Sequence, residues 1–418
     1  MYKAYKQRLK LPKDQKAFIV NLMYKSKNLY NEALYNVRQH FFNTKKYLSY
    51  HENYQLLKNS DNYKTLSSTQ AQMVIRKVDE AMSSFFGSLK ANVKKVKLPR
   101  YLKKNSLYPL FDRMIYKPND DKYIMPRSNF IKAVNNDIKE INNKLSKYTK
   151  ELSLKEFYFN IKTPKCITNK AIKEITIKPI FNGQYIEVIY VYKDEVKVNS
   201  YQGIETMGID FGYKNLATCA TTNNKPLLID GNGLKSYNQL YHKTIAKLSS
   251  SRPNQDVLTN KMIKVIDKRN RRMTYGINKA ARLIINHAID NDIGLIVIGY
   301  NDNFKDETLS KRYNQWTKSI PLARLRDRII YLASLSNIET KVINEAYTSI
   351  SSYLDQDLLV KSEFSGKRVK RGLYQSSNGS LINADLNAAL NILKKGNPDA
   401  LWIGNSGMNT PKRTYLFN

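Results

Sequence analysis

One acidic motif constrains the fold of this chain more than any other feature. Asp210 stands at the end of the apolar run 207–211, Gly212 turns the chain, and a second apolar stretch follows from residue 213 onward. Apolar runs of this length around a glycine predict two paired, buried strands, with the acid where the first strand ends. A second acid, Asp385, opens a helical stretch lined with small residues. The chain is therefore expected to build a buried sheet and a helix that each present a carboxylate.

The order of elements around these two acids is typical of a ribonuclease-H-type α/β domain. Hydrophobic periodicity predicts strands, a long helical stretch, a strand, a helix, a strand and a closing helix. Their expected positions are 203–222 for the first two strands, 225–230 for the third, 241–291 for the helical stretch, 295–298 for the fourth strand, 322–334 for the next helix, 339–344 for the fifth strand and 384–394 for the closing helix. In such a domain Asp210 and Asp385 are candidate metal ligands.

The charge of the chain points to a polyanionic partner. Among 418 residues, 70 are Lys or Arg and 35 are Asp or Glu, which gives a net charge of +35. An excess of this size favours nucleic acid. No apolar run approaches the ~20 residues that span a bilayer, and the basic start of the chain lacks the apolar region of a signal peptide. Cys166 and Cys219 are the only cysteines, which fits a reducing cytoplasm and excludes a four-cysteine zinc ribbon within this sequence.

Cleavage of a phosphodiester by two Mg²⁺ ions needs a cluster of acids that holds both ions. Asp210 and Asp385 supply two of these acids, and the third is expected at the end of the fourth strand. Gly299 stands at that place instead. Without a replacement, two carboxylates hold Mg²⁺ weakly, so the absent acid decides whether the protein cuts nucleic acid or only binds it.

Glu345 is the candidate replacement, because it follows the fifth strand, the neighbour of the fourth in this fold. Adjacent strands lie about 4.8 Å apart, so a glutamate displaced by one strand can reach the same ions, and Gly299 leaves space for it. The alternative for Glu345 is a solvated acid at a strand end. The alternative for Asp210 is a structural role in forming the turn before Gly212. The alternative for Asp385 is also structural, because a helix dipole favours an acid in the first turn of any helix.

The start of the chain predicts one strand followed by a helical bundle. Residues 5–11 alternate as a strand that ends at Pro12, and apolar residues then recur with a helical period from about 14 to 91. Residues 67–69 have the composition of a cap at the N-terminus of a helix. The bundle is thus expected to be inserted after the first strand.

Strand patterns resume at residues 157–161 and continue in a hairpin. Residues 175–181 and 185–192 are rich in β-branched and aromatic side chains, and the dipeptide Asn182-Gly183 lies between them. Asn-Gly between two such runs is a strong signal for a type I′ turn. The first half of the chain therefore predicts a β-barrel or sheet that carries the helical insertion.

Basic residues gather in three segments that are candidates for contacting nucleic acid. In the connector after the helical bundle, lysines are spaced by apolar anchors, which suits phosphate contacts, although a solvated linker is the alternative. A solvated basic face is also the alternative for the other two segments. The candidate residues are Lys94, Lys95, Lys97, Arg100, Lys103 and Lys104 in the connector, Lys268, Arg269, Arg271 and Arg272 in the long helical stretch, and Lys367, Arg368, Lys370 and Arg371 before Asp385.

These segments together resemble the TnpB family, transposon-encoded RNA-guided DNA endonucleases that are the ancestors of type V CRISPR effectors. The resemblance covers nearly the full length, and its last four motifs are together specific. The motifs are Leu98-Pro99-Arg100-Tyr101-Leu102-Lys103-Lys104, Gly208-Ile209-Asp210-Phe211-Gly212, Ile298-Gly299-Tyr300-Asn301, Glu345-Ala346-Tyr347-Thr348-Ser349, residues 364–374, and Asn383-Ala384-Asp385-Leu386-Asn387.

The chain departs from most of that family in two places. Most members carry a glutamate after the fourth strand and a four-cysteine zinc ribbon between Tyr347 and Asp385, and this chain has neither. Ser351 and Ser352 fall near the first cysteine positions. The chain resembles the subset that lacks the ribbon and carries a rearranged glutamate before Tyr-Thr-Ser, which favours Glu345 as the third ligand.

The resemblance implies a multidomain α+β plan. A wedge β-barrel would combine residues 1–11 with 105–200, a helical recognition bundle would occupy 12–104, and a RuvC-like α/β nuclease domain would fill 201–418, with a ribbon-less insertion at about 347–381. It also implies a structured guide RNA derived from the transposon end and a double-stranded DNA target. Base pairing would select that target next to a short flanking motif.

The predicted function is RNA-guided, Mg²⁺-dependent cleavage of DNA. Asp210, Glu345 and Asp385 would be the catalytic residues and would hold two Mg²⁺ ions, and no zinc is expected. A nuclease-inactive, RNA-guided DNA-binding repressor is the first alternative, and a compact type V CRISPR effector and a ribonuclease-H-class transposase are others. We expect a cytoplasmic, nucleoid-associated prokaryotic protein without a membrane partner, and the sequence leaves the oligomeric state open.

Overall fold

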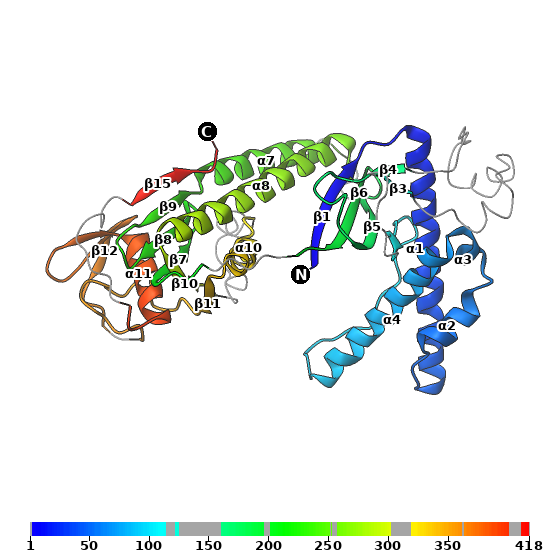
Figure 1. Ribbon diagram of the computed structural model, residues 1–418, viewed down its shortest axis with the longest axis horizontal. Coiled ribbons are helices and arrows are strands. Elements are labelled where there is room, and N and C mark those ends of the chain that lie inside the picture. The colour runs from blue at the N-terminus through cyan, green and yellow to red at the C-terminus, as the bar shows by residue number, and fades with distance from the viewer. Residues whose placement is uncertain are drawn as a thin grey trace. The chain divides into compact units, whose positions relative to one another are not determined.

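A computed structural model of the protein describes residues 2–113, 122–124, 160–195, 201–250, 252, 257–301, 319–361, 363–400 and 411–417. The chain divides into two compact units, Met1–Val196 and Lys197–Asn418, and both contain helices and sheets (Figure 1). The multidomain α+β class predicted from the sequence is therefore confirmed. The predicted strand residues 157–159 and the predicted boundary at residue 200 lie outside the described residues.

The helical bundle of the N-terminal unit follows the predicted pattern. The repeating apolar side chains, such as Phe18, Leu22 and Leu34, are buried in its core. The predicted cap is confirmed, since the Ser67 hydroxyl accepts a hydrogen bond from the Gln70 backbone N–H at 3.3 Å. The helices described in this unit are α1 (Lys13–Thr44), α2 (Tyr50–Leu57), α3 (Asp61–Thr65) and α4 (Ser68–Lys90).

The N-terminal unit also contains a sheet with the strand order β1-β6-β5-β2. The predicted hairpin joins β5 and β6: Asn182 and Gly183 have φ values of 51° and 85°, and the Gln184 N–H donates to the Phe181 carbonyl at 3.2 Å. The predicted first strand is present but ends at Leu9, two residues early. The strands are β1 (Tyr2–Leu9), β2 (Leu110–Asp112), β3 (Lys122–Ile124), β4 (Asn160–Lys162), β5 (Ile172–Ile180) and β6 (Tyr185–Lys193), with β3 and β4 paired apart from the rest.

The C-terminal unit is built on a six-stranded sheet with the order β11-β10-β7-β8-β9-β15. Strands β7, β8 and β9 are antiparallel neighbours, whereas β10 runs parallel to β7, β11 parallel to β10, and β15 parallel to β9. Five strands occupy the predicted places in the predicted order, and β15 is additional. The strands are β7 (Glu205–Phe211), β8 (Asn215–Thr221), β9 (Leu227–Asp230), β10 (Ile293–Gly299), β11 (Glu339–Ile343) and β15 (Lys412–Tyr415).

The predicted single helical stretch 241–291 is wrong, because two helices occupy this part of the chain. The first starts earlier than predicted, and the second begins at a new cap, where the Thr259 hydroxyl accepts from the Met262 N–H at 3.2 Å. Pro253 lies between them in the sequence, and a proline cannot donate to a helical carbonyl. The helices described in this unit are α7 (Asn232–Ser250), α8 (Asn260–Asp290), α10 (Leu322–Leu335) and α11 (Ala384–Gly396).

The six-stranded sheet has different helices on its two faces (Figure 1). Ile209 of β7 is buried in one core with Ile277 of α8. Gly208 points to the opposite face, where a Cβ atom would collide with the carbonyl oxygen of Ala389 in α11. Because successive strand residues face opposite sides, Asp210 belongs to the α11 face. The glycine is needed for the close approach of helix and strand.

The predicted insertion contains a small antiparallel sheet that the sequence analysis did not anticipate. Its strands are β12 (Lys367–Lys370), β13 (Leu373–Gln375) and β14 (Leu381–Asn383), in that order. The last strand leads directly into α11. Among the described residues, no helix combines the length and the apolar composition that a membrane-spanning segment needs.

Candidate active site

Asp210 lies at the C-terminal end of β7, between the two neighbouring strands β8 and β10. It pairs in register with Thr218 of β8, and the residues before it are buried while its own side chain is only partly buried. The hydrophobic run thus ends where the sheet opens toward α11. This position is the one that the sequence predicts for the first carboxylate.

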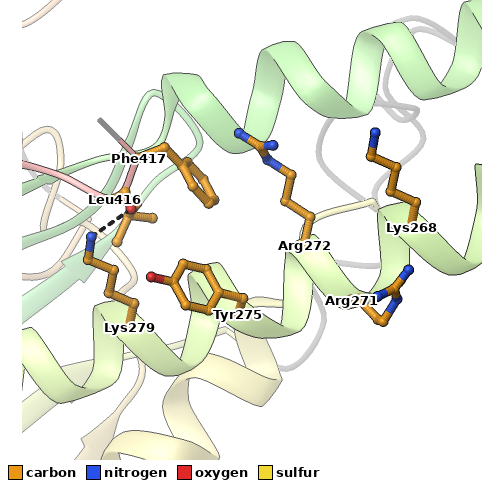
Figure 2. Close-up of a pocket in the computed structure, with 7 residues that line it drawn as sticks. All are labelled: Lys268, Arg271, Arg272, Tyr275, Lys279, Leu416 and Phe417. Carbon is orange, nitrogen blue, oxygen red and sulfur yellow. Dashed lines mark hydrogen bonds between the residues drawn. The ribbon is translucent and has the colours of Figure 1, made fainter. Parts of the chain in front are cut away.

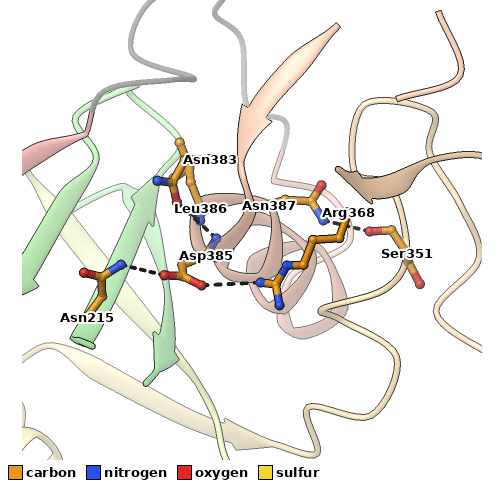
Figure 3. A network of polar contacts seen from close by, with 7 residues as sticks. All are labelled: Asn215, Ser351, Arg368, Asn383, Asp385, Leu386 and Asn387. Carbon is orange, nitrogen blue, oxygen red and sulfur yellow. Dashed lines mark hydrogen bonds and ion pairs between the residues drawn. The ribbon is translucent and has the colours of Figure 1, made fainter. Parts of the chain in front are cut away.

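Asp385 is held in the first turn of α11 by its own surroundings (Figure 3). The Asn383 side chain caps the helix, accepting hydrogen bonds from the backbone N–H groups of Asp385 at 3.0 Å and Leu386 at 3.1 Å. One carboxylate oxygen accepts from the Asn215 amide at 2.6 Å. The other forms an ion pair with Arg368 at 3.6 Å. The sequence analysis missed Asn215, although a polar residue that opens a buried strand is a signal for such a role.

Glu345 lies beside the position where the expected acid is absent. Gly299 ends β10 and pairs with Ile343 of β11, two residues before Glu345. A Cβ atom built on Gly299 would lie 3.4 Å from the Cβ atom of Glu345 and would overlap the side chain of Ile392 in α11. The end of β10 is therefore occupied by Glu345 and Ile392, and the glycine leaves them room.

The three acids influence one another electrostatically. Burial raises the pKa of the Asp210 carboxyl well above its ordinary value, and the negative charges of Asp385 and Glu345 raise it further, while Arg368 lowers it. Like charges that disfavour ionisation of a carboxyl are relieved by a bound cation. The donor set, three carboxylates at strand and helix ends, consists of the oxygen ligands that Mg²⁺ prefers.

The acids do not, however, already form a metal-binding cage. Within the part of the chain that the structure describes, no three His, Cys, Asp or Glu side chains are grouped closely enough to hold an ion. Asp385 is instead engaged by Asn215 and Arg368. A cation at this place would compete with those two partners for the carboxylate.

Hydrogen bonds tie the insertion to α11. The side chain of Asn387 accepts from the Tyr353 N–H at 2.9 Å and donates to the Ser351 carbonyl at 2.8 Å. Asn391, one turn later, donates to the carbonyls of Thr348 and Ser351 at 3.0 and 2.8 Å. All of these contacts are buried. The sequence analysis missed both asparagines, which recur one helical turn apart among small apolar residues.

A buried aspartate organises the loop of the insertion itself. The Asp357 carboxylate accepts from the Ser352 N–H at 2.7 Å and from the Ser365 hydroxyl at 2.6 Å. Ser351 and Ser352, which stand near the expected cysteine positions, are fully buried. Polar contacts thus connect the two sides of the loop.

The predicted basic connector lies against the helices of the N-terminal unit. Its six candidate residues are exposed, while Leu98 and Leu102 pack on the N-terminal core. Asn31 of α1 accepts from the Leu102 N–H at 2.8 Å and donates to the Leu102 carbonyl at 3.0 Å. The connector is therefore docked on α1, with its apolar anchors inward and its charges outward.

The remaining basic candidates separate into two groups. Lys268, Arg271 and Arg272 are exposed on α8, and the four candidates of the insertion are exposed on or next to β12. Arg269 differs, because it donates to the Asn238 side chain at 3.0 Å and to the Ser319 carbonyl at 2.5 Å. Those contacts give Arg269 a role in joining α7, α8 and the segment before α10.

Comparisons with known proteins agree with this architecture. A family model described as probable transposase (OrfB_IS605) matches residues 189–304. The TnpB-like protein ORF457 of Acidianus two-tailed virus is 25% identical over 401 residues, covering 88% of this chain and 81% of the viral protein. A Cas12f1 protein, solved by cryo-EM in a complex with sgRNA and target DNA, aligns over 91% of this chain and 83% of its own, with 16% identity and a TM-score of 0.58.

The structural match shows that this chain and the Cas12f1 protein share a fold. Together with the family and sequence matches, it confirms the resemblance that the motifs indicate. The chain is thus similar to TnpB-family proteins in its motifs, its sequence and its fold.

Proposed function

We propose that the protein is an RNA-guided DNA endonuclease that hydrolyses phosphodiester bonds next to a short flanking motif, with Mg²⁺ held by Asp210, Glu345 and Asp385. The Cas12f1 protein of similar fold was solved in a complex with sgRNA and target DNA, which supports a guide RNA and a DNA target as the partners of this chain. The net charge of +35 suits a polyanionic partner of that size.

The observation that carries the proposal is the raised pKa of Asp210 beside two further acids. The charges of Asp385 and Glu345, from separate parts of the sequence, act on Asp210 at one end of the sheet, where the repulsion costs free energy that a bound cation would recover. A purely structural acid is normally placed beside cations or hydrogen-bond donors. The arrangement at Asp210 favours a metal-dependent role.

Each residue would contribute in a different way. Two Mg²⁺ ions, when bound, would generate the hydroxide nucleophile and stabilise the leaving oxygen. Asp210, whose pKa the charges of both other acids raise, would be one ligand, Glu345 would replace the acid absent at Gly299, and Asp385 is oriented by Asn215. Arg368, which is half exposed, can exchange its ion pair with Asp385 for a phosphate of the nucleic acid.

The same proposal includes the finer domain plan. The six-stranded sheet with its helices would be a RuvC-type nuclease domain occupying residues 201–418, and the sheet of the N-terminal unit would belong to a wedge barrel formed by residues 1–11 and 105–200. Residues 12–104 would be the recognition bundle. The strand order β9-β8-β7-β10-β11, with antiparallel and then parallel neighbours, supports the ribonuclease-H assignment.

One observation favours a second candidate, an RNA-guided DNA-binding protein that does not cut. Asp385 is paired with Arg368 and Asn215, and the described acids form no ready cage. If these contacts persist when nucleic acid is bound, the acids cannot hold Mg²⁺ for cleavage. Recognition of DNA would then be the whole activity.

The decisive experiment expresses the protein with its native flanking DNA and purifies the ribonucleoprotein. The particle is incubated with a guide-matched plasmid library of flanking motifs, in Mg²⁺ or in EDTA. Mg²⁺-dependent cutting supports the nuclease, whereas tight guide-dependent binding without cutting moves the protein to the second candidate.

A pair of variants tests the role of Glu345. We expect Glu345→Gln to abolish cutting, because it removes a ligand charge. Glu339→Gln, at the exposed opposite end of β11, makes the same change of charge and should cut like the native protein. Cutting that survives in Glu345→Gln would leave the nuclease standing and remove Glu345 from the ligand set.

A further inference from the structure

A basic groove with an aromatic floor lies on the C-terminal unit, along α8 and the segment after β15 (Figure 2). Its volume is about 650 Å³. Two lysines, two arginines, two aromatic rings and one buried leucine line it: Lys268, Arg271, Arg272, Tyr275, Lys279, Leu416 and Phe417. Among the described residues, no acid lines this groove, so the groove is suited to an anion.

The five lining residues of α8 form one face of that helix. Residues three and four positions apart in a helix are neighbours on its surface, and the intervals from Lys268 through Tyr275 to Lys279 keep to that spacing. At 1.5 Å per residue, the eleven steps from Lys268 to Lys279 extend about 16 Å, over which one strand of a duplex carries about five phosphates. The groove therefore matches a stretch of nucleic-acid backbone rather than one small anion.

Arg272 is held in place by two rings. Its guanidinium carbon lies 4.7 Å from the ring centre of Tyr237 in α7 and 4.5 Å from that of Phe417. Stacking occupies the faces of a guanidinium and leaves N–H groups at its edge to bind phosphate oxygens. Since the side chain is already ordered, less conformational entropy is lost when it binds an anion.

Two glycines leave the space that the Phe417 ring occupies. A Cβ atom on Gly233 of α7 would lie 2.8 Å from the Phe417 ring, and one on Gly276 of α8 would lie 3.3 Å from it. Lys279 fixes the same segment by donating to the Leu416 carbonyl at 2.9 Å. The aromatic floor is thus a built feature and not a chance contact of a loose segment.

Other groups of the groove remain available to a ligand. Tyr275 is 58% exposed, and its ring is large enough to stack on a base. Arg271 pairs with Asp267 at 3.1 Å, but its side chain is 68% exposed, so that ion pair is weak and can be exchanged for a phosphate. The groove combines exposed cations with an exposed ring, as single-strand binding sites do.

The position of the groove distinguishes between nucleic-acid partners. α8 packs on the face of the sheet that buries Ile209, whereas Asp210 belongs to the face covered by α11. A strand held in the groove is therefore separated by the sheet from the acids proposed to cut. The expected occupant of the groove is therefore the RNA, which the proposed reaction leaves intact, and not a DNA strand that is cleaved.

We infer that this groove binds an unpaired segment of the RNA partner, with phosphates on Lys268, Arg271 and Arg272 and a base stacked on Tyr275. The inference rests on the proposed function, which supplies the RNA partner and places the cutting acids on the other face of the sheet.

The first test is a cross-link from the groove in the complete particle. The full-length protein carries Tyr275→p-benzoylphenylalanine and is assembled with its co-purifying RNA and a matched DNA target, each with a different label. Irradiation should attach the RNA to position 275. A cross-link to DNA in place of RNA, or no cross-link at this position in a particle that retains its RNA, would overturn the inference.

The second test measures affinity for the co-purifying RNA in EDTA. Lys268→Ala/Arg271→Ala should bind at least about tenfold more weakly, and the slope of log affinity against log salt should fall by about 1.4, which is about 0.7 per single-strand phosphate contact. Tyr275→Ala should weaken binding roughly fivefold or more through lost stacking. Arg272→Lys keeps the charge but loses the ordered guanidinium, so its affinity should fall between those of the native protein and Arg272→Ala.

Matched controls separate this site from general charge effects. Lys225 and Lys361 are exposed in the same unit and lie outside the groove, so Lys225→Ala/Lys361→Ala removes the same charge elsewhere. Equal loss of affinity and slope in this control would overturn the inference, as would no loss in Lys268→Ala/Arg271→Ala. Melting curves of all variants identify any that fail to fold, and Arg272→Lys then carries the test.

The outcomes for the groove and for the nuclease are separable. A protein that shows the cross-link and the salt effect but never cuts keeps the groove and loses the endonuclease. A protein that cuts normally and cross-links elsewhere keeps the endonuclease and loses the groove. Failure of the native protein to retain any RNA would remove both.

Discussion

The two faces of the six-stranded sheet carry opposite charges. On the α11 face, Asp210, Glu345 and Asp385 approach one another with Arg368 at their edge. On the α8 face, lysines and arginines follow one side of a helix without an acid in the groove lining. A layer of buried apolar residues such as Ile209 separates the faces. The alternation of side chains along a strand thus keeps the proposed cation site and the proposed anion site on opposite sides of one sheet.

The largest effect is expected from a substitution that changes only the acidic face. Asp210→Asn should remove essentially all Mg²⁺-dependent cutting, because the charge of a proposed metal ligand is lost, while RNA affinity stays at the native level. Plasmid cleavage and RNA binding measured on the same preparation check this. Parallel loss of both activities would mean that the two faces do not work independently.

The next effect concerns the tie between the acidic face and the insertion. Asn387→Leu removes the buried acceptor of the Tyr353 N–H, which costs about 1–3 kcal/mol, and one of the two amide donors to the Ser351 carbonyl. The melting temperature should therefore fall, and cutting should weaken as Arg368 and Asp385 lose their alignment. The control Asn378→Leu changes an exposed turn of the same insertion. A melting temperature equal to that of the native protein would show that these hydrogen bonds do not hold the insertion.

A further prediction concerns whether the same insertion needs zinc for its stability. Because polar contacts of Asn387, Asn391 and Asp357 join its parts, a strong zinc chelator should leave the melting temperature unchanged. A drop on chelation, reversed by added zinc, would contradict this expectation.

A smaller effect is expected where a cation borders the acids. Arg368→Gln removes the positive charge that lowers the pKa of Asp210, so the acids repel more strongly and attract Mg²⁺ more tightly. The Mg²⁺ concentration for half-maximal metal binding should fall by up to about fivefold, the range of a half-exposed ion pair. Isothermal titration with Mg²⁺ measures it, and Lys370→Gln on the same strand is the control. A higher requirement for Mg²⁺ would mean that Arg368 helps to assemble the site.

The smallest effect is expected at Asp194, an acid that, unlike Asp210, has two lysines as hydrogen-bond donors. Hydrogen bonds from Lys170 and Lys3 lower the pKa of Asp194 to about 2. A lowered pKa contributes stability that is present above the ordinary value of 3.8 and is lost as the pH falls through about 2. Asp194→Asn should therefore melt slightly earlier than the native protein at neutral pH, and the difference should vanish near pH 2. Melting curves across this range check the sign.

Local patterns predicted most elements correctly, since each depends on neighbouring residues. The apolar run before Asp210 became β7, the Asn182-Gly183 dipeptide became the hairpin turn, and Ser67 became a cap. The division of the stretch 241–291 into two helices was missed because continuous periodicity outweighed a single Pro253. The strand β15 was missed because a short basic segment becomes a strand only when β9 offers it an edge.

The sequence by itself determined the charge, the order of strands and helices, and the identity of Asp210 and Asp385 as acids at the ends of elements, because those properties are local. Tertiary structure alone decided which side chains meet. It placed Glu345 against Gly299 and brought Asn215 and Arg368 to Asp385. It also seated Phe417 between two glycines beside Arg272. Such contacts join residues far apart in the chain, and sheet register and helix packing, which no short pattern contains, set their distances.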